Sequence, residues 1–196
     1  MRVSILFSAA LLGMCASCPL FAQSTQELIA QAIRPLPEDL RAEATVFRYD
    51  PTSGERIVLR QGSNHVECRP KDEEGFTRCT PTATASRSDL SSRLRAQGLS
   101  DEDVNAALAE AERKGEINAR IFGSISYRLY DEPDRIQLLW ILSVPNATPE
   151  QLGMPIGSQR SNAIAGKGTP WMMEPGTPGA HLMIPINGTE LSNKPQ

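Results

Sequence analysis

Short β-forming runs separated by turns dominate the first part of the chain, after one opening helix. Ser24 and Glu27 have the spacing of a capping box, and the helical apolar pattern behind them ends at Pro35. Residues 44–49 and 56–60 are rich in β-forming side chains and are separated by a turn that contains proline and glycine. This pattern predicts a hairpin with a longer loop.

The rest of the chain continues this alternation. It predicts, in order, strands at 65–68 and 76–79, a connector at 81–87, helices that begin at Ser88 and Ser100, a hairpin at 117–130 and 136–144, and short strands at 171–173 and 181–186. We expect residues 146–168 to form a long loop and the tail from about residue 187 to be frayed. The pattern therefore predicts an α+β fold: a single antiparallel β-sheet domain with two or three short helices packed on one face and long Pro/Gly-rich loops.

Residues 1–22 have the three parts of a secretory signal peptide. Arg2 is followed by a short apolar run and then by Ala22, a small residue before the expected cleavage point. The run is shorter than the roughly 20 residues of a spanning helix, and no later segment comes closer, so we expect no membrane span in the mature chain. Residues 23–196 then form one domain. A lipid anchor on Cys18 is a minor alternative to periplasmic or secreted export.

The number and distribution of charged residues argue against a nucleic-acid partner. The sequence has 20 basic and 23 acidic residues, and removal of Arg2 with the signal peptide leaves 19 against 23, a net charge of −4. No run of basic residues has the density that nucleic acid requires, so we expect no nucleic-acid partner. An envelope component or another protein remains the expected partner class.

Two cysteines remain in the mature chain, Cys68 and Cys79. Export places them in an oxidising compartment, where a close pair is normally bridged. A metal or redox pair would need Cys-x-x-Cys spacing or nearby histidines, and only His65 is close. We therefore expect a structural disulfide.

Several stretches carry a family resemblance. They are Ala44-Thr45-Val46, residues 59–64 followed by Cys68, Pro170-Trp171-Met172-Met173, Gly176-Thr177-Pro178 and Ala180-His181-Leu182-Met183-Ile184-Pro185. In these the chain resembles an uncharacterised family of small secreted bacterial proteins with a signal peptide, a disulfide and this C-terminal pattern. The resemblance implies export, the disulfide and one domain, and it brings no catalytic residue.

Sequence signatures of catalysis are missing. The chain has two histidines, His65 and His181, and contains no Gly-x-Ser-x-Gly elbow, P-loop, dinucleotide fingerprint, His-Glu-x-x-His helix or EF-hand loop. We predict no catalytic residue and lean away from an enzyme.

One cluster has unusual chemistry. Trp171, Met173, His181 and Met183 lie on two strands joined by a turn, and period-two alternation allows them to share one face. Thioether and imidazole groups are ligands that select Cu(I), and the tryptophan face can cap a cation. Core packing is the simpler interpretation, because methionine commonly fills gaps beside aromatic rings.

These observations favour an exported, non-enzymatic binding or envelope-associated module without a cofactor. The loop at 146–168 is one candidate binding surface. Periplasmic Cu(I) binding through the Trp/Met/His cluster is the alternative, and copper is then the bound metal.

Overall fold

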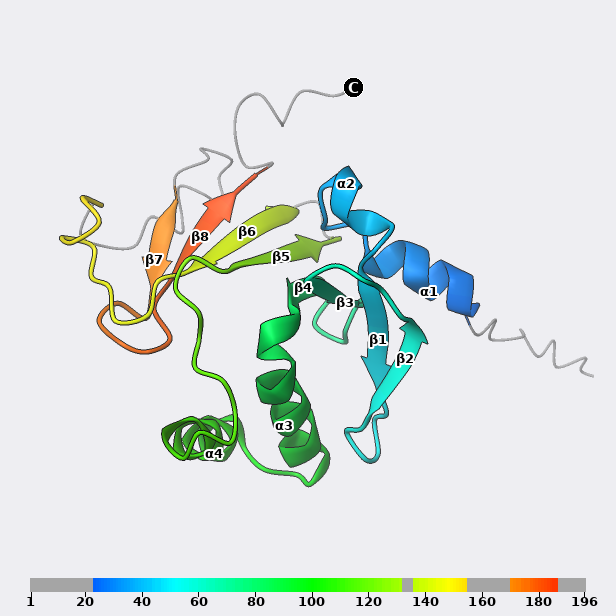
Figure 1. The fold of residues 1–196 in the computed structure, drawn as a ribbon, viewed down its shortest axis with the longest axis horizontal. Helices are drawn as coiled ribbons and strands as arrows, with labels where there is room; N and C mark the ends of the chain where they lie inside the picture. Colours follow the sequence, from blue (N-terminus) through cyan, green and yellow to red (C-terminus); the bar gives the residue numbers. More distant parts are fainter. Residues whose placement is uncertain (1–22, 132–135, 155–169, 187–196) are drawn as a thin grey trace, which may run out of the picture.

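The structure, a computed structural model, describes residues 23–131, 136–154 and 170–186. The predicted signal peptide, residues 155–168 of the long loop and the tail from 187 lie outside the described residues. Figure 1 shows the described elements: α1 (Thr25–Ala32), α2 (Glu38–Arg41), β1 (Thr45–Tyr49), β2 (Arg56–Arg60), β3 (Val66–Arg69), β4 (Phe76–Pro81), α3 (Ala85–Ala96), α4 (Asp101–Arg113), β5 (Ile125–Tyr130), β6 (Leu138–Ser143), β7 (Trp171–Met173) and β8 (His181–Pro185).

The strands form one eight-stranded sheet in the order β2-β1-β3-β4-β5-β6-β8-β7. The α+β prediction is confirmed, but the prediction of a purely antiparallel sheet is wrong. β1 and β3 run parallel, with Thr45 opposite Glu67 and Val46 opposite Cys68, whereas the other neighbouring strands are antiparallel. The sheet is therefore mixed.

The parallel pair exists because the chain crosses the start of β1 between β2 and β3. At this crossing, a Cβ on Gly62 would lie 2.2 Å from the Glu43 carbonyl oxygen and 2.4 Å from the Thr45 nitrogen, so only glycine fits. The amides of Ser63 and Asn64 both donate to the Glu43 oxygen, at 2.9 and 3.0 Å. This close crossing brings β3 to the far side of β1 in the same direction as β1.

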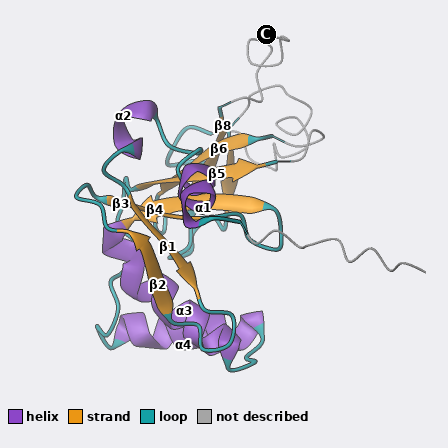
Figure 2. Cartoon of the chain, turned by 90° about the vertical axis from the view of Figure 1, so that its right-hand side faces the viewer, coloured by secondary structure: helices purple, strands orange, loops and turns teal. Residues whose placement is uncertain are grey.

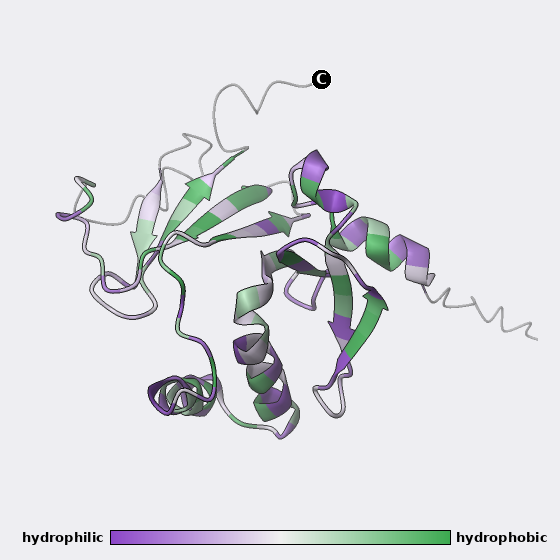
Figure 3. Ribbon diagram, in the orientation of Figure 1, coloured by the Kyte–Doolittle hydropathy of each residue, from purple (hydrophilic) through white to green (hydrophobic). Residues whose placement is uncertain are grey.

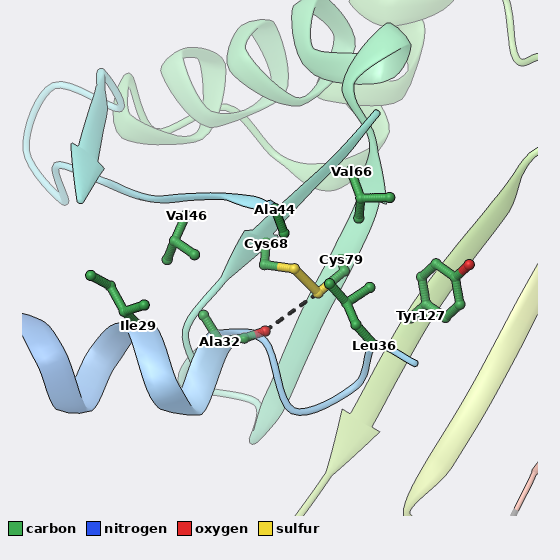
Figure 4. Close-up of a cluster of buried hydrophobic side chains, with 9 residues drawn as sticks. All are labelled: Ile29, Ala32, Leu36, Ala44, Val46, Val66, Cys68, Cys79 and Tyr127. Atoms are coloured by element: carbon green, nitrogen blue, oxygen red, sulfur yellow. Dashed lines mark hydrogen bonds between the residues drawn. A yellow bond between two sulfur atoms is a disulfide. The ribbon is translucent and has the colours of Figure 1, made fainter. Parts of the chain in front are cut away.

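Helix α1 packs over the predicted disulfide, which is confirmed. Ser24 and Glu27 form both hydrogen bonds of the capping box, and α1 buries Ile29 and Ala32. The Cys68–Cys79 bridge is completely buried beneath the helix, and Cys79 Sγ lies 3.3 Å from the Ala32 carbonyl oxygen (Figure 4). Capping, apolar burial and the crosslink thus stabilise the same part of the sheet.

Helices lie on both faces of the sheet, so the prediction that they share one face is wrong. In β1, Val46 packs with the α1 core, whereas the hydroxyl of Tyr49 donates to Asp89 of α3 at 2.8 Å. In β3, Cys68 belongs to the α1 core, whereas the adjacent Arg69 lies over the Tyr49 ring, so Tyr49 is on the opposite face from that core. In Figure 4, α1 lies on one side of the disulfide-linked strands and the other helices lie on the far side; Figure 2 shows α3 and α4 together below the sheet.

The α3–α4 pair has a small core of its own. Its buried members are Val104, Leu108, Ala111 and Ile117, and Leu90, Leu94 and Leu99 pack against them. Hydrophilic residues recur along the rest of both helices (Figure 3). The predicted helical pair is confirmed, although α3 begins at Ala85, within the expected connector, because no proline or glycine interrupts residues 82–97.

The segment after α4 also differs from the prediction. A strand was expected from residue 117, but β5 begins at Ile125. Ile117 packs with α4 instead, and Gly123 adopts a left-handed turn with φ +80°. This segment carries the chain from the helical pair back to the sheet.

We predict that Cys68→Ala together with Cys79→Ala lowers the free energy of unfolding by about 3 kcal/mol, because the bridge closes a loop of about 12 residues in the unfolded chain. Urea unfolding measures the change. A reductant is expected to destabilise the wild type similarly and to leave the double variant unchanged. A double variant within about 0.5 kcal/mol of the wild type would contradict the assignment.

Candidate anion-binding cleft

The Trp/Met/His cluster predicted from the sequence lies on one face of the sheet. Trp171 is opposite Met183, and Met173 is opposite His181. Directly opposed residues of an antiparallel pair share a face, so the four side chains do so. Trp171 and Met183 are buried in an apolar cluster with Leu139, whereas Met173 is 39% exposed. Half of the predicted metal site therefore belongs to a packed core.

His181 is half-buried at the edge of this cluster. Its Nδ1 lies 2.8 Å from the Gly179 carbonyl oxygen, which can only accept, so Nδ1 donates this hydrogen bond. Among the described residues, no three His, Cys, Asp or Glu side chains are placed to hold a metal ion. A metal ion at His181 would therefore need thioether ligands from Met173 and Met183.

A row of three arginines lies on this same face. Arg69 of β3 is opposite Arg78 of β4, and Arg78 is opposite Arg128 of β5. Cross-strand neighbours have their Cβ atoms roughly 5 Å apart, and like charges at that distance repel. We call Arg69, Arg78 and Arg128 the arginine row.

Within the described residues, ion pairs form only at the middle of the row, although the charge of Asp72 also acts on Arg69 and Arg128. Arg78 forms ion pairs with Asp72 at 3.0 Å and Glu74 at 2.8 Å. No carboxylate within the described residues pairs with Arg69 or Arg128. These two guanidinium groups lie over aromatic rings instead. Arg69 is 5.4 Å from the Tyr49 ring centroid and Arg128 is 5.0 Å from that of Phe76.

Burial affects the ionisation of the two outer arginines of the row. Burial, with a smaller contribution from Arg78, lowers the pKa of Arg128 to about 10, and burial lowers the pKa of Arg69 as well. The charged row is thus held at a free-energy cost that a bound anion would offset. The buried Nε–H of Arg78 also has no acceptor.

Helix α3 forms the opposite wall, and Arg56 of β2 holds it in place. The Arg56 guanidinium donates to Glu67 at 2.8 Å and to Asp89 of α3 at 2.7 Å. At the β1–β2 turn, Gly54 approaches the helix so closely that a Cβ there would lie 2.5 Å from the Ser92 carbonyl oxygen. These contacts place the polar side of α3 beside the arginine row.

The cavities along this face include three that share Arg69 and Arg78. The first, about 320 Å³, is lined by the whole arginine row together with Arg120, and it reaches Ser143 and His181. The second, about 370 Å³, is lined by five arginines and by serines of α3, and by no acidic residue from the described part of the chain. Among the described residues, the only carboxylate that lines the first is Glu174. The third, about 460 Å³, is also lined by Arg95 and by four acidic residues, Asp72, Glu73, Glu74 and Asp101. Although the whole chain is acidic, with a net charge of −3, the first two cavities are basic.

Sequence reasoning missed the cleft because its arginines are far apart in the chain. The positions of the two cysteines could have indicated part of the arginine row. A bridged pair on neighbouring strands points into the core, so Arg69 after Cys68 and Arg78 before Cys79 must point to the other face together. The convergence of Arg128 and α3 on that face depends on tertiary structure.

Comparison with known proteins gives no direct guide to this cleft. No protein-family model, curated protein or solved structure matches the chain. The resemblance to a secreted bacterial family therefore stays a prediction. In the described part of the chain, no helix has the length and apolar character needed to cross a membrane.

We predict that Arg128→Met stabilises the ligand-free protein by up to about 1 kcal/mol, because it removes a like-charge contact and keeps apolar contact with Phe76. Since Arg128 is uncharged in the fold above its pKa of about 10, the gain should shrink as the pH rises through that value. Urea unfolding at several pH values measures both effects.

The matched control is Arg113→Met, which changes a solvent-facing arginine of α4 that pairs with Glu110. Its effect should stay within about 0.5 kcal/mol. A clear loss of stability in Arg128→Met would mean that this arginine supports the fold rather than a ligand.

Proposed function

We propose that the protein is an exported, non-enzymatic binding protein that holds an anionic ligand in the cleft between the arginine row and α3. The observation that carries this proposal is the unpaired state of Arg69 and Arg128 beside Arg78. Three adjacent guanidinium groups with one paired member form a site whose missing component is negative charge.

Export rests on the N-terminal signal features and accords with the buried disulfide, which persists in oxidising compartments. The periplasm or the extracellular space is the proposed location. The ligand would then be an anionic solute or an anionic group of an envelope component.

Inorganic phosphate is a suitable probe, because its oxygens accept from several guanidinium groups at once. We expect calorimetry to show one-to-one binding that is weakened at least roughly tenfold by Arg69→Gln together with Arg128→Gln, since hydrogen bonds to charged groups contribute about 1.5–3 kcal/mol each. Ionic strength is held constant with chloride.

The control for this titration is Arg113→Gln, which removes an arginine outside the cleft and should bind phosphate like the wild type. Unfolding temperature checks that each variant is folded. A wild type that neither binds phosphate nor sulfate nor gains thermal stability from them would overturn the proposal.

Cu(I) binding is the second candidate function. It is favoured by the shared face of Met173, His181 and Met183 and by the hydrogen bond through Nδ1 that orients the His181 ring. The electrostatics favour the anion, because His181 lines the same cavity as the arginine row and a cation there would be repelled.

A competition titration of Cu(I) against a chromophoric chelator tests this candidate. If copper is a ligand, Met173→Ala and His181→Ala abolish competition because each removes a ligand atom. Met172→Ala is the matched control, since Met172 lies on the opposite face of β7, and it should compete normally. Equal competition by all four proteins, or none by the wild type, would remove copper from consideration.

A further inference from the structure

An exposed apolar turn precedes β5. Ile121 is 46% exposed and Phe122 is 68% exposed, and Ile125 at the start of β5 is also exposed. Three of the six exposed large apolar side chains in the described part of the chain thus fall within five residues, whereas such side chains are usually scattered singly. We call Ile121 and Phe122 the apolar turn.

Hydrogen bonds hold the apolar turn in place. The Ser124 amide donates to the Ile121 carbonyl oxygen at 3.2 Å, and the Gly123 amide donates to the Ser143 oxygen of β6 at 2.8 Å. Neither Ile121 nor Phe122 packs against an apolar cluster of the described residues. The two side chains are therefore presented to solvent from a fixed point of the sheet.

The apolar turn adjoins the first cavity of the cleft. Arg120, which immediately precedes the turn, lines this cavity, and so does Ser143, whose backbone holds the turn. Ser143 is opposite His181, and His181 is opposite Met173, another exposed apolar residue. Figure 1 shows the segment between α4 and β5 reaching the sheet at the end where the β7–β8 turn also lies. Exposed apolar groups and the cavity thus share one end of the sheet.

Positive charge is available in the first cavity. Arg120, like Arg69 and Arg128, forms no ion pair with a carboxylate from the described part of the chain. Four arginines line this cavity, against the single described carboxylate of Glu174, which is exposed. An anionic group is therefore the complementary occupant of this cavity.

The acidic residues near the arginine row lie at the other end of β5. Residues 72–74, which line the third cavity, belong to the turn between β3 and β4 that leads into Phe76. Phe76 is opposite Tyr130, the last residue of β5, whereas the apolar turn precedes Ile125, the first. At about 3.3 Å per residue, roughly 15 Å of strand separates the two turns, which exceeds the screening length of about 8 Å at physiological salt. The acidic turn therefore does little to neutralise the end of the cleft that carries the apolar turn.

An exposed apolar pair beside a basic cavity matches the surface of an anionic bilayer. Basic side chains are attracted to acidic headgroups, and apolar side chains enter the boundary between headgroups and acyl chains. A free anion would pair with the arginines and leave the apolar turn in water. An apolar protein surface would cover the turn and leave the cavity without an anion. The bilayer supplies both kinds of contact.

We propose that the first cavity binds the phosphate of an anionic phospholipid that stays in its bilayer, while Ile121 and Phe122 insert beside that headgroup. This inference rests on the proposed anion-binding function and specifies a membrane surface as the source of the anion. The attachment is peripheral, because a two-residue turn reaches only the boundary region of the bilayer.

Co-sedimentation with vesicles at constant ionic strength tests the inference on the disulfide-intact mature chain. We expect the wild type to bind vesicles of mixed phosphatidylglycerol and phosphatidylcholine at least roughly tenfold more tightly than vesicles of phosphatidylcholine alone. Phe122→Ser should weaken binding to the mixed vesicles at least roughly tenfold, because it removes most of the inserted apolar area. Arg120→Gln should weaken it about fivefold, and Glu174→Gln should strengthen it.

The matched control is Val58→Ser. Val58 is also exposed, but it lies in β2 at the other edge of the sheet, so this variant should bind both kinds of vesicle like the wild type. Glycerol phosphate, the soluble part of the headgroup, should bind Phe122→Ser and the wild type equally in calorimetry, because the cavity is unchanged. Unfolding temperature checks that each variant is folded.

Three results would overturn the inference: equal binding to the two kinds of vesicle, binding of Phe122→Ser like the wild type, or binding of Arg120→Gln like the wild type. Phosphate binding would then leave the site for a soluble anion standing. A wild type that binds neither glycerol phosphate nor inorganic phosphate would overturn the proposed function itself.

Discussion

Arg56 forms ion pairs with two carboxylates, and the rest of the cleft depends on these two interactions. This guanidinium binds Glu67 of the sheet and Asp89 of α3 at once, and it lies 3.6 Å from the centroid of the Phe47 ring. It thereby joins the β1–β2 hairpin, the sheet face and the helix. Glu67 and Asp89 are paired with Arg56, and neither forms an ion pair with Arg69. The same contact that builds the cleft leaves it positively charged.

The cleft also separates two kinds of packing. On the α1 side, helix capping, apolar burial and a disulfide concentrate stability in the sheet. On the α3 side, guanidinium groups and serines line the cavities. A rigid sheet can therefore hold three mutually repelling arginines in register, which a less well supported surface would allow to separate.

Local signals in the sequence predicted most individual elements. The capping box at Ser24, the turn glycines and the spacing of Cys68 and Cys79 each act over a few residues, and the elements they predict are present. The parallel β1–β3 pair was missed because it depends on how Gly62 crosses the start of β1, a tertiary contact. The arginine row was missed for the same physical reason, whereas the shared face of the Trp/Met/His cluster followed from strand parity alone.

The separate core of α3 and α4 has a consequence for dynamics. The helical pair buries its leucines against itself and meets the sheet through polar contacts such as that between Tyr49 and Asp89. Such a pair forms a cooperative unit that can detach while the disulfide-linked strands stay folded. Amide protons of α3 would then exchange with solvent faster than those of β3 and β4, and a molecule bound across both walls would slow that exchange.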